Sequence, residues 1–121
     1  MNWTTLILVA GVVVVFFLLR HSGKISVKDA RGYLKKGALV IDVRSAAEFI
    51  DGHLPNALNL PLSEIEAILP RHVADKHRVL LLHCQSGARS AIARKMVKKM
   101  GYPQVFNLGS YARAAEVVNG R

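Results

Sequence analysis

Residues 83–90 read HCQSGARS, directly after an apolar run, Val79 to Leu82, and at the start of an amphipathic segment, Ala88 to Met100. The apolar run predicts a buried strand, and the amphipathic segment predicts a helix. A turn of small residues between a strand and a helix gathers several backbone N–H groups, and the helix N-terminus adds partial positive charge. We therefore expect an anion-binding cradle at this point of an α/β fold.

Cys84 lies in this turn and is the only cysteine of the chain. A helix N-terminus and the nearby Arg89 would stabilise a thiolate there, so we expect the pKa of the Cys84 thiol to fall below that of a free thiol. A lone cysteine is more often a small buried hydrophobe than a nucleophile. The position after a strand, before a helix and near an arginine favours the nucleophile, and Cys84 is our candidate catalytic residue.

Strands and helices are predicted to alternate along the rest of the chain. Apolar runs predict five strands, which include Ile25 and fall within residues 38–41, 57–60, 79–83 and 104–107. Caps and periodicity predict helices between Ser26 and Gly37, over 45–50, from a Ser63–Glu66 capping box to Leu69 before Pro70, over 88–100 and over 110–118. This alternation predicts a parallel sheet covered by helices on both faces.

Composition narrows the classes of protein. The chain has 121 residues, enough for one domain, and a net charge of +9 with all 17 Lys and Arg at or after Arg20. Such a charge suits nucleic acid, an anionic membrane surface or anionic small molecules. The aromatic residues are not interleaved with the basic ones, so we expect no nucleic-acid partner. One cysteine and five scattered histidines exclude a disulfide within the chain and leave no ligand spacing for a metal.

The N-terminal segment carries no charged side chain before Arg20. We predict a transmembrane anchor over residues 1–20, a linker over 21–24 and a folded domain over 25–121, with membrane lipid contacted by residues 3–20. A cleaved signal peptide is the alternative, but no basic side chain precedes the apolar run and no cleavage motif follows it. Basic residues after the run place the N-terminus outside and the domain on the cytoplasmic side of an inner membrane.

Basic residues also cover one side of the segment 88–100, namely Arg94, Lys95, Lys98 and Lys99. A solvated helix face is the preferred interpretation. The alternative is a face that lies on anionic lipid or attracts anionic small molecules toward Cys84.

Three motifs in order resemble the signatures of the rhodanese-like domain family. They are Ile41-Asp42-Val43-Arg44 with Glu48-Phe49, the segment Gly52 to Ala57, and the segment Cys84 to Ser90. The resemblance covers roughly residues 25 to 112, one domain. It implies an α/β fold with a parallel five-stranded sheet flanked by helices, in the manner of single-domain, membrane-anchored bacterial members.

The resemblance implies sulfur transfer. The cysteine of such a loop attacks a sulfane-sulfur donor such as thiosulfate and holds the sulfur as a persulfide, which a thiol, cyanide or a protein acceptor then takes. No cofactor or metal is implied. The implied site consists of the nucleophile Cys84, the loop residues Gln85, Ser86, Gly87, Ala88, Arg89 and Ser90, and the supporting residues Asp42, Arg44, Glu48 and His53.

The supporting residues have expected roles. Arg89 is expected to hold anionic donor oxygens in a planar fork. Arg44 and Glu48, four residues apart, are expected to form an ion pair near the loop. Asp42 is expected to brace the fold and His53 to hold the turn after Gly52.

Two other functions remain open. A phosphatase or arsenate reductase of the same fold normally has five residues between the cysteine and the arginine, whereas this chain has four, Gln85 to Ala88. A histidine before the cysteine, here His83, is also seen in that branch. A non-catalytic scaffold domain at the membrane is the alternative from another class, although such domains usually lose the nucleophile. The chain departs from the family near its end, where many members carry a tryptophan. Tyr111 could fill the place of that aromatic ring only approximately.

Overall fold

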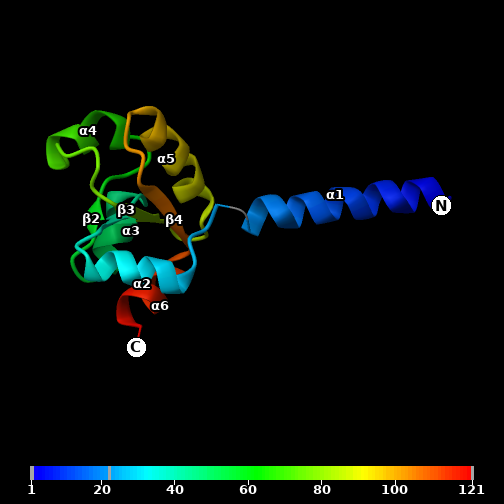
Figure 1. Cartoon of the computed structure of the whole chain (residues 1–121), viewed down its shortest axis with the longest axis horizontal. Coiled ribbons are helices and arrows are strands. Elements are labelled where there is room, and N and C mark those ends of the chain that lie inside the picture. Colours follow the sequence, from blue (N-terminus) through cyan, green and yellow to red (C-terminus); the bar gives the residue numbers. More distant parts are fainter. Residues whose placement is uncertain (1, 22, 121) are drawn as a thin grey trace.

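The structure is a computed structural model that describes residues 2–21 and 23–120, and it centres on a parallel sheet (Figure 1). The sheet has four strands in the order β2-β1-β3-β4. Their bounds are β1 (Leu39–Asp42), β2 (Leu58–Asn59), β3 (Leu80–His83) and β4 (Val105–Gly109). The helices are α1 (Trp3–His21), α2 (Val27–Lys35), α3 (Ala46–Asp51), α4 (Ile65–His72), α5 (Ala88–Lys99) and α6 (Tyr111–Asn119).

Helices cover both faces of the sheet, as the alternating pattern predicts. Helices α4 and α5 lie on one face and α2 and α6 on the other (Figure 1). Each face has its own apolar core: Ile41 and Leu82 point toward Ile65 of α4 and Val97 of α5. On the opposite face, Leu81 packs with residues of α2 and α6. Alternation along each strand supplies both cores, because successive side chains point to opposite faces.

The parallel register gathers three strand ends at one edge of the sheet. Asp42 of β1 pairs with His83 of β3, and His83 pairs with Gly109 of β4 across a register shift after Leu82. The chain leaves β3 at Cys84, so the candidate loop starts at this carboxyl edge. Ligand sites of open parallel sheets form at such edges.

The sheet has four strands, and the prediction of five was wrong. The segment at Ile25 forms only an isolated bridge between Lys24 and Asn107, in which the Ile25 N–H donates to the Asn107 carbonyl at 3.0 Å. The next residue, Ser26, already caps α2 by accepting from the Asp29 N–H. The chain therefore turns into a helix before a strand can extend.

The N-terminal helix does not support the predicted anchor. Among the residues that the structure describes, no helix is long and apolar enough to cross a membrane. The apolar run from Trp3 to Leu19 has 17 residues, which as a helix would reach about 26 Å, less than the roughly 30 Å of a hydrocarbon core. The predictions of a transmembrane helix over residues 1–20, of lipid contact through it, and of a domain held at an inner membrane were wrong. Ser22 of the predicted linker lies outside the described residues.

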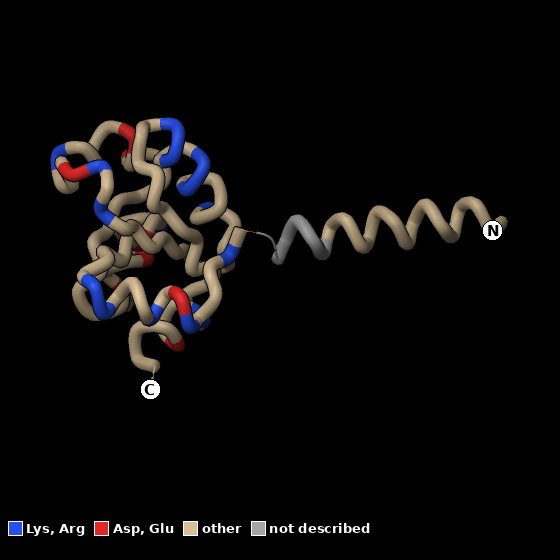
Figure 2. Tube along the Cα trace, in the orientation of Figure 1, with Lys and Arg blue, Asp and Glu red and all other residues tan. Residues whose placement is uncertain are grey.

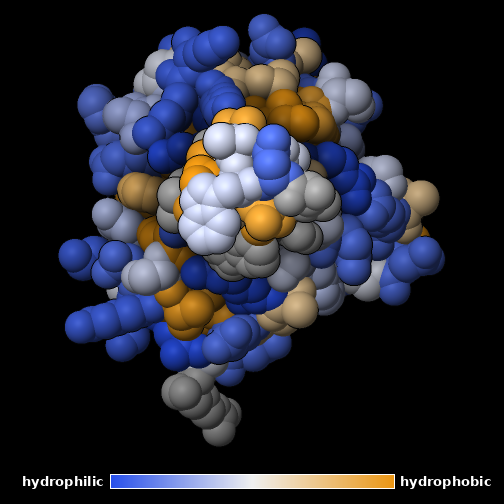
Figure 3. Space-filling model, turned by 90° about the vertical axis from the view of Figure 1, so that its right-hand side faces the viewer, coloured by the Kyte–Doolittle hydropathy of each residue, from blue (hydrophilic) through white to orange (hydrophobic). Residues whose placement is uncertain are grey.

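Helix α1 stands apart from the sheet and its covering helices (Figure 1). Its described large apolar side chains, such as Trp3 and Leu8, are exposed. Viewed along α1, the surface behind it is mostly hydrophilic, with smaller hydrophobic patches between the polar groups (Figure 3).

The other helices were predicted in the right places but not always with the right ends. Helix α4 begins at Ile65 with Glu64 at its N-cap and no side-chain cap, so the predicted Ser63–Glu66 capping box was wrong. A turn precedes it, in which the Glu64 and Ile65 N–H groups both donate to the Pro61 carbonyl. Pro70 lies inside α4 instead of ending it.

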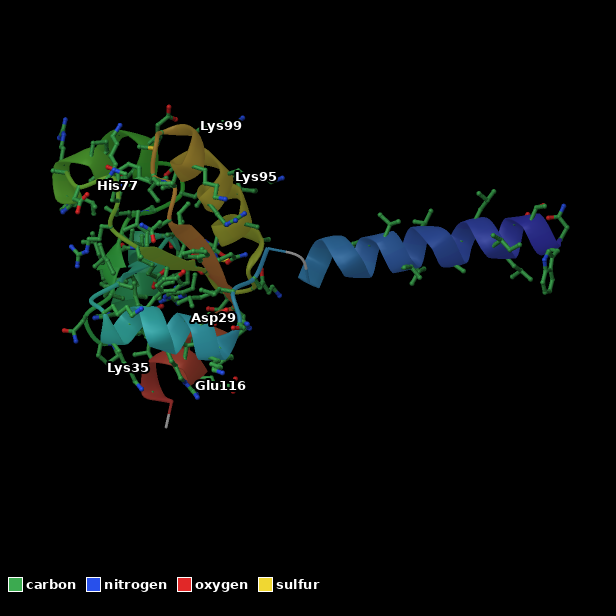
Figure 4. All side chains as sticks on the ribbon, viewed as in Figure 1. Asp29, Lys35, His77, Lys95, Lys99 and Glu116 are labelled. Carbon is green, nitrogen blue, oxygen red and sulfur yellow. The ribbon has the colours of Figure 1, made fainter. Side chains whose placement is uncertain are left out.

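The basic side of α5 is largely solvated. Lys95, Lys98 and Lys99 are exposed, and Figure 4 shows Lys95 and Lys99 pointing away from the domain. Arg94 differs, because its Nε donates to the Val105 carbonyl at 3.0 Å and ties α5 to β4.

Candidate active site

The segment from Cys84 to Ser90 forms the predicted cradle between β3 and α5. The Cys84 N–H donates to the Gly109 carbonyl at 3.2 Å, which fixes the start of the loop against β4. Gly87 is the N-cap of α5 and has a left-handed backbone with φ +99°. This conformation, which glycine adopts without strain, turns the Gly87 N–H onto Cys84 Sγ at 2.9 Å.

The Gly87 backbone also lies against Gly109 at the end of β4. A Cβ at Gly87 would lie 3.4 Å from both Cα and the carbonyl carbon of Gly109. The loop is further tied to the turn before α6, because Ser86 bridges Ser110 and the Tyr111 N–H donates to the Gln85 carbonyl at 3.2 Å. The loop is therefore held by β4 and its following turn as well as by its own helix.

Ser90, in the first turn of α5, provides the second side of the cradle. Its hydroxyl lies 3.6 Å from Cys84 Sγ and 2.7 Å from Oδ1 of Asn107 on β4. Asn107 Oδ1 also accepts from the Gly109 N–H at 2.8 Å, which fixes the orientation of its amide. Sequence reasoning missed Asn107, and the only signal was a polar residue inside an apolar strand pattern.

The environment of Cys84 sets its ionisation. Burial raises the pKa of the Cys84 thiol, since the residue is fully covered. Hydrogen bonds from the Ser90 backbone and hydroxyl and from the Gly87 and Ser86 amides more than offset this, so the pKa lies below the usual value. The cradle thus favours a thiolate, as the loop pattern predicted.

Asp42 and Arg44 form a buried ion pair beside the loop. Arg44 donates from Nη2 to Asp42 Oδ2 at 2.7 Å and from Nη2 to the Gly52 carbonyl at 2.7 Å. Its Nη1 reaches Gln85 Oε1 at 3.4 Å, and its guanidinium carbon lies 4.7 Å from the centre of the Tyr111 ring. The hydrogen bond to Asp42 raises the pKa of Arg44.

Glu48 pairs with Arg89 and not, as predicted, with Arg44. Two hydrogen bonds join them, Nη1 to Oε1 at 2.6 Å and Nη2 to Oε2 at 2.9 Å. The bonds from Arg89, followed by that from the Ser45 backbone, lower the pKa of Glu48 to about 2. Arg89 was predicted to face an anionic donor, but in this structure a carboxylate of the chain already fills its fork.

The two histidines near the site, His53 and His83, each lie against a backbone carbonyl. His53 Nδ1 lies 2.9 Å from the Phe49 carbonyl, and its ring stacks on the Phe49 ring with centres 3.8 Å apart. His83 is buried, with Nδ1 3.2 Å from the Cys84 carbonyl and Nε2 3.7 Å from Asp42 Oδ2. Burial lowers the pKa of His83, so the imidazole is neutral at pH 7.

Metal chemistry has no ligand set in the part of the chain that the structure describes. No group of three or more His, Cys, Asp or Glu side chains lies close enough to hold an ion there.

Parallel α/β proteins with a cysteine held by loop amides between a strand and a helix form a structural class to which this fold and site belong. Comparison with known proteins narrows the class, because the profile of the rhodanese-like domain matches residues 26–113. The chain belongs to the rhodanese-like domain family.

Relatives of known description support the same assignment. The chain is 33% identical over 69 residues to the thiosulfate sulfurtransferase PspE of Escherichia coli, covering 57% of this chain and 66% of that protein. It is 33% identical over 103 residues to the human thiosulfate:glutathione sulfurtransferase, covering 72% of this chain and 88% of that protein. The chain thus spans just under two thirds of the length of the Escherichia coli relative.

A solved structure shows the same fold. The structure of a human single-domain sulfurtransferase superposes with a TM-score of 0.65 at 29% identity, covering 78% of this chain and 96% of that chain. The matched region of this chain is accordingly one domain-sized unit of the family.

Proposed function

We propose that this protein is a sulfurtransferase that moves sulfane sulfur from an anionic donor such as thiosulfate to a thiophilic acceptor through a persulfide on Cys84. The observation that carries the proposal is the set of donors around Cys84 Sγ, above all the Gly87 N–H at 2.9 Å. The names of the relatives support thiosulfate as donor, and that of the human relative supports a thiol as acceptor.

The first half of the reaction follows from the cradle. The Cys84 thiolate attacks the outer sulfur of thiosulfate, an S–S bond to Cys84 forms, and sulfite leaves with the electron pair of the broken S–S bond. A persulfide anion remains on Cys84. The amides that face Sγ, with the Ser90 hydroxyl, are placed to stabilise negative charge at the sulfur of Cys84 as the reaction proceeds.

The second half returns the enzyme to its starting state. A thiolate or cyanide attacks the outer sulfur of the persulfide and takes it, and the Cys84 thiolate leaves. Thiocyanate is the product with cyanide, and a persulfide is the product with a small thiol or a protein thiol. Because Cys84 is covered in this structure, part of its surroundings must move to admit a reactant.

A thiocyanate assay tests this proposal. We expect the purified protein to form thiocyanate from thiosulfate and cyanide, and the Cys84→Ser variant to form none. The matched control is Ser86→Ala in the same loop, which keeps the backbone N–H and should retain activity, because the Ser86 side chain is exposed. Release of phosphate from an aryl phosphate without any thiocyanate would favour the phosphatase of the same fold and overturn the proposal.

A further inference from the structure

His83 is a buried histidine beside the nucleophile, and the reaction proposed above does not use it. Its side chain is completely covered. The ring lies beside Asp42 of β1 and meets the Tyr111 ring of α6 edge-on, with ring centres 5.7 Å apart. Nε2 of the ring has no hydrogen-bond partner in the part of the chain that the structure describes. A buried polar atom without a partner is rare, so this one needs an explanation.

The surroundings of the ring favour a proton on Nδ1. This atom lies 3.2 Å from the Cys84 carbonyl oxygen, which can only accept, so the contact is a hydrogen bond only when Nδ1 carries the proton. A proton on Nε2 instead would set two lone pairs against each other at that distance. Asp42 Oδ2, which lies 3.7 Å from Nε2, already accepts from Nε and Nη2 of Arg44 at 3.0 and 2.7 Å. The neutral Nδ1–H tautomer therefore satisfies Cys84 and leaves Nε2 without a partner.

The bond from His83 holds the second of the two peptide groups that flank Cys84. The first is held by β4, because the Cys84 N–H donates to the Gly109 carbonyl at 3.2 Å. Among the described residues, His83 Nδ1 is the one group that donates to the Cys84 carbonyl. The two peptide planes of a residue determine its φ and ψ angles. Both backbone angles of the nucleophile are therefore fixed by hydrogen bonds, and His83 fixes ψ.

The same peptide group determines where the next amide points. The peptide between Cys84 and Gln85 is trans, so its N–H points opposite to the carbonyl that His83 holds. Since the carbonyl is directed at a buried ring, the Gln85 N–H is directed away from it. Within the described ranges no protein atom accepts from this N–H, whereas the amides of Ser86 and Gly87 already act on Cys84. The Gln85 amide is thus an unused donor at the start of the loop.

We propose, on the basis of the sulfur transfer proposed above, that His83 is a positioning residue for the persulfide. Its neutral Nδ1–H tautomer holds the Cys84 carbonyl on the buried side and leaves the Gln85 N–H free to donate to the sulfur that Cys84 receives. The bonds that form and break are those given above for thiosulfate. Transfer moves negative charge from Sγ to the outer sulfur, and an amide that is already in place stabilises it there. His83 contacts neither the donor nor the sulfur and acts through this peptide alone.

NMR of the full chain labelled with ¹⁵N at histidine tests the tautomer. At about pH 8 the ring is neutral, because burial lowers the pKa of His83. We expect a long-range ¹H–¹⁵N spectrum to show a protonated Nδ1 and an unprotonated Nε2 for His83, whose signals are assigned by their loss in His83→Asn. A proton on Nε2 would leave Nδ1 unable to donate to Cys84 and would overturn the inference.

Two substitutions of His83 separate positioning from filling of the core. Asparagine keeps an amide nitrogen at about the position of Nδ1, whereas leucine fills the space without a donor. In single-turnover reactions with thiosulfate, His83→Asn should take up sulfur within about two-fold of the wild-type rate, and His83→Leu about five-fold more slowly, the effect of one lost hydrogen bond. Urea denaturation should give the opposite order, with His83→Leu the more stable variant, because leucine buries no polar atom.

His83→Gln is the positional control. Its side chain carries the same amide as asparagine, but one bond further out, at about the position of Nε2. We therefore expect sulfur uptake to fall as in His83→Leu, although the chemistry of the side chain matches that of His83→Asn.

The outcomes separate this inference from the proposed function. If the wild-type protein takes up no sulfur from thiosulfate, the proposed function fails and this inference fails with it. If the wild type takes up sulfur and folded His83→Leu is as fast as the wild type or as His83→Asn, the proposed function stands. In that case His83 only fills the core, and the positioning role is overturned.

Discussion

At the scale of single residues, the thiol of Cys84 depends on neighbours that are distant in sequence as well as near. Gly87 and Ser90 are three and six residues away and belong to the recognisable loop. Asn107, from β4, holds the Ser90 hydroxyl at 2.7 Å and is reached only because β4 lies beside β3. The groups that contact the Cys84 thiol are close to it in the sequence, whereas the residue that holds Ser90 in place comes from another strand.

Replacement of Ser90 by alanine should raise the pKa of the Cys84 thiol. The Ser90 hydroxyl lies 3.6 Å from Sγ and lowers this pKa, so its loss shifts the ionisation upward, while alanine keeps the backbone N–H. The rate of alkylation by iodoacetamide, measured against pH, should therefore reach half its maximum at higher pH than in the wild type. The control Ser86→Ala leaves the loop amides in place, and a profile shifted equally in both variants would contradict the role of the Ser90 hydroxyl.

Replacement of Asp42 by asparagine should destabilise the protein. Asp42 is fully buried and Arg44 nearly so, and removal of one partner leaves a buried guanidinium without its counter-charge. We expect a loss of about 3 kcal/mol in the free energy of unfolding, measured by urea denaturation. Asp51→Asn, an exposed change of the same chemistry, should stay within about 0.5 kcal/mol. A similar small loss in Asp42→Asn would show that the buried pair contributes little.

The sequence predicted correctly which charged residues lie near the loop, but not which of them form ion pairs with each other. Residues 84–90 could be predicted to lie together because they are contiguous in one loop, so their proximity does not depend on the rest of the fold. The partners of Arg44 and Arg89 could not, since spacing along a helix favours Arg44 with Glu48. The backbone instead leaves β1 so that Arg44 folds back onto Asp42, and Glu48 turns to α5.

At the scale of elements, the site is a junction of β3, β4 and α5 that depends on the close approach of two glycines. Gly87 ends the loop with a positive φ and Gly109 ends β4, also with a positive φ. Their backbones lie so close that a side chain on Gly87 would meet Gly109. The position of the Cys84–Ser90 loop therefore depends on the course of β4.

Replacement of Gly87 by alanine should reduce both stability and sulfur transfer. The left-handed backbone costs a side chain about 1–2 kcal/mol, and the added Cβ would lie in contact with Gly109 at 3.4 Å. Gly37→Ala is the matched control, because Gly37 has φ +95° and nothing within 4 Å of an added Cβ. We expect similar losses of unfolding free energy from backbone strain but a fall in thiocyanate formation only in Gly87→Ala. Equal activity in the two variants would contradict a geometric role for Gly87.

The sequence also predicted the order of elements better than their number and ends. Buried strands such as Leu80–His83 stood out because they are apolar on both faces. The expected strand at Ile25 failed because Ser26 starts a helix at once, so the N-cap prevailed over a short apolar signal. Helix α4 was misjudged at both ends because a turn stabilised by the Pro61 carbonyl delays its start, and Pro70 is accommodated near its end.

At the scale of the whole molecule, basic residues are distributed over most of the domain, and α1 lacks them in its described N-terminal part (Figure 2). The net charge of +9 arises wholly from residues 20–121. A positive field of this kind raises the local concentration of small anions around the domain. The predicted membrane role of the same charges depended on a spanning helix, and no helix among the described residues could cross a membrane.

Sulfur transfer from an anionic donor should weaken as salt is added. We expect kcat/KM for thiosulfate to fall several-fold between about 10 mM and about 500 mM sodium chloride, because ions screen the attraction of the domain for a dianion. The kcat should change little, since the loop amides act at short range. A kcat/KM that is independent of salt would show that the net charge does not assist donor binding.

The central claim is that Cys84 accepts sulfane sulfur, and mass spectrometry of the intact protein tests it most directly. The full chain, reduced and then incubated with thiosulfate, should gain the mass of one sulfur atom, which cyanide should remove. Because Cys84 is the only cysteine, the modified site can be mapped to a single peptide. We predict the gain on the peptide that contains Cys84 and no gain in Cys84→Ser. An unmodified Cys84 after exposure to thiosulfate would contradict the account.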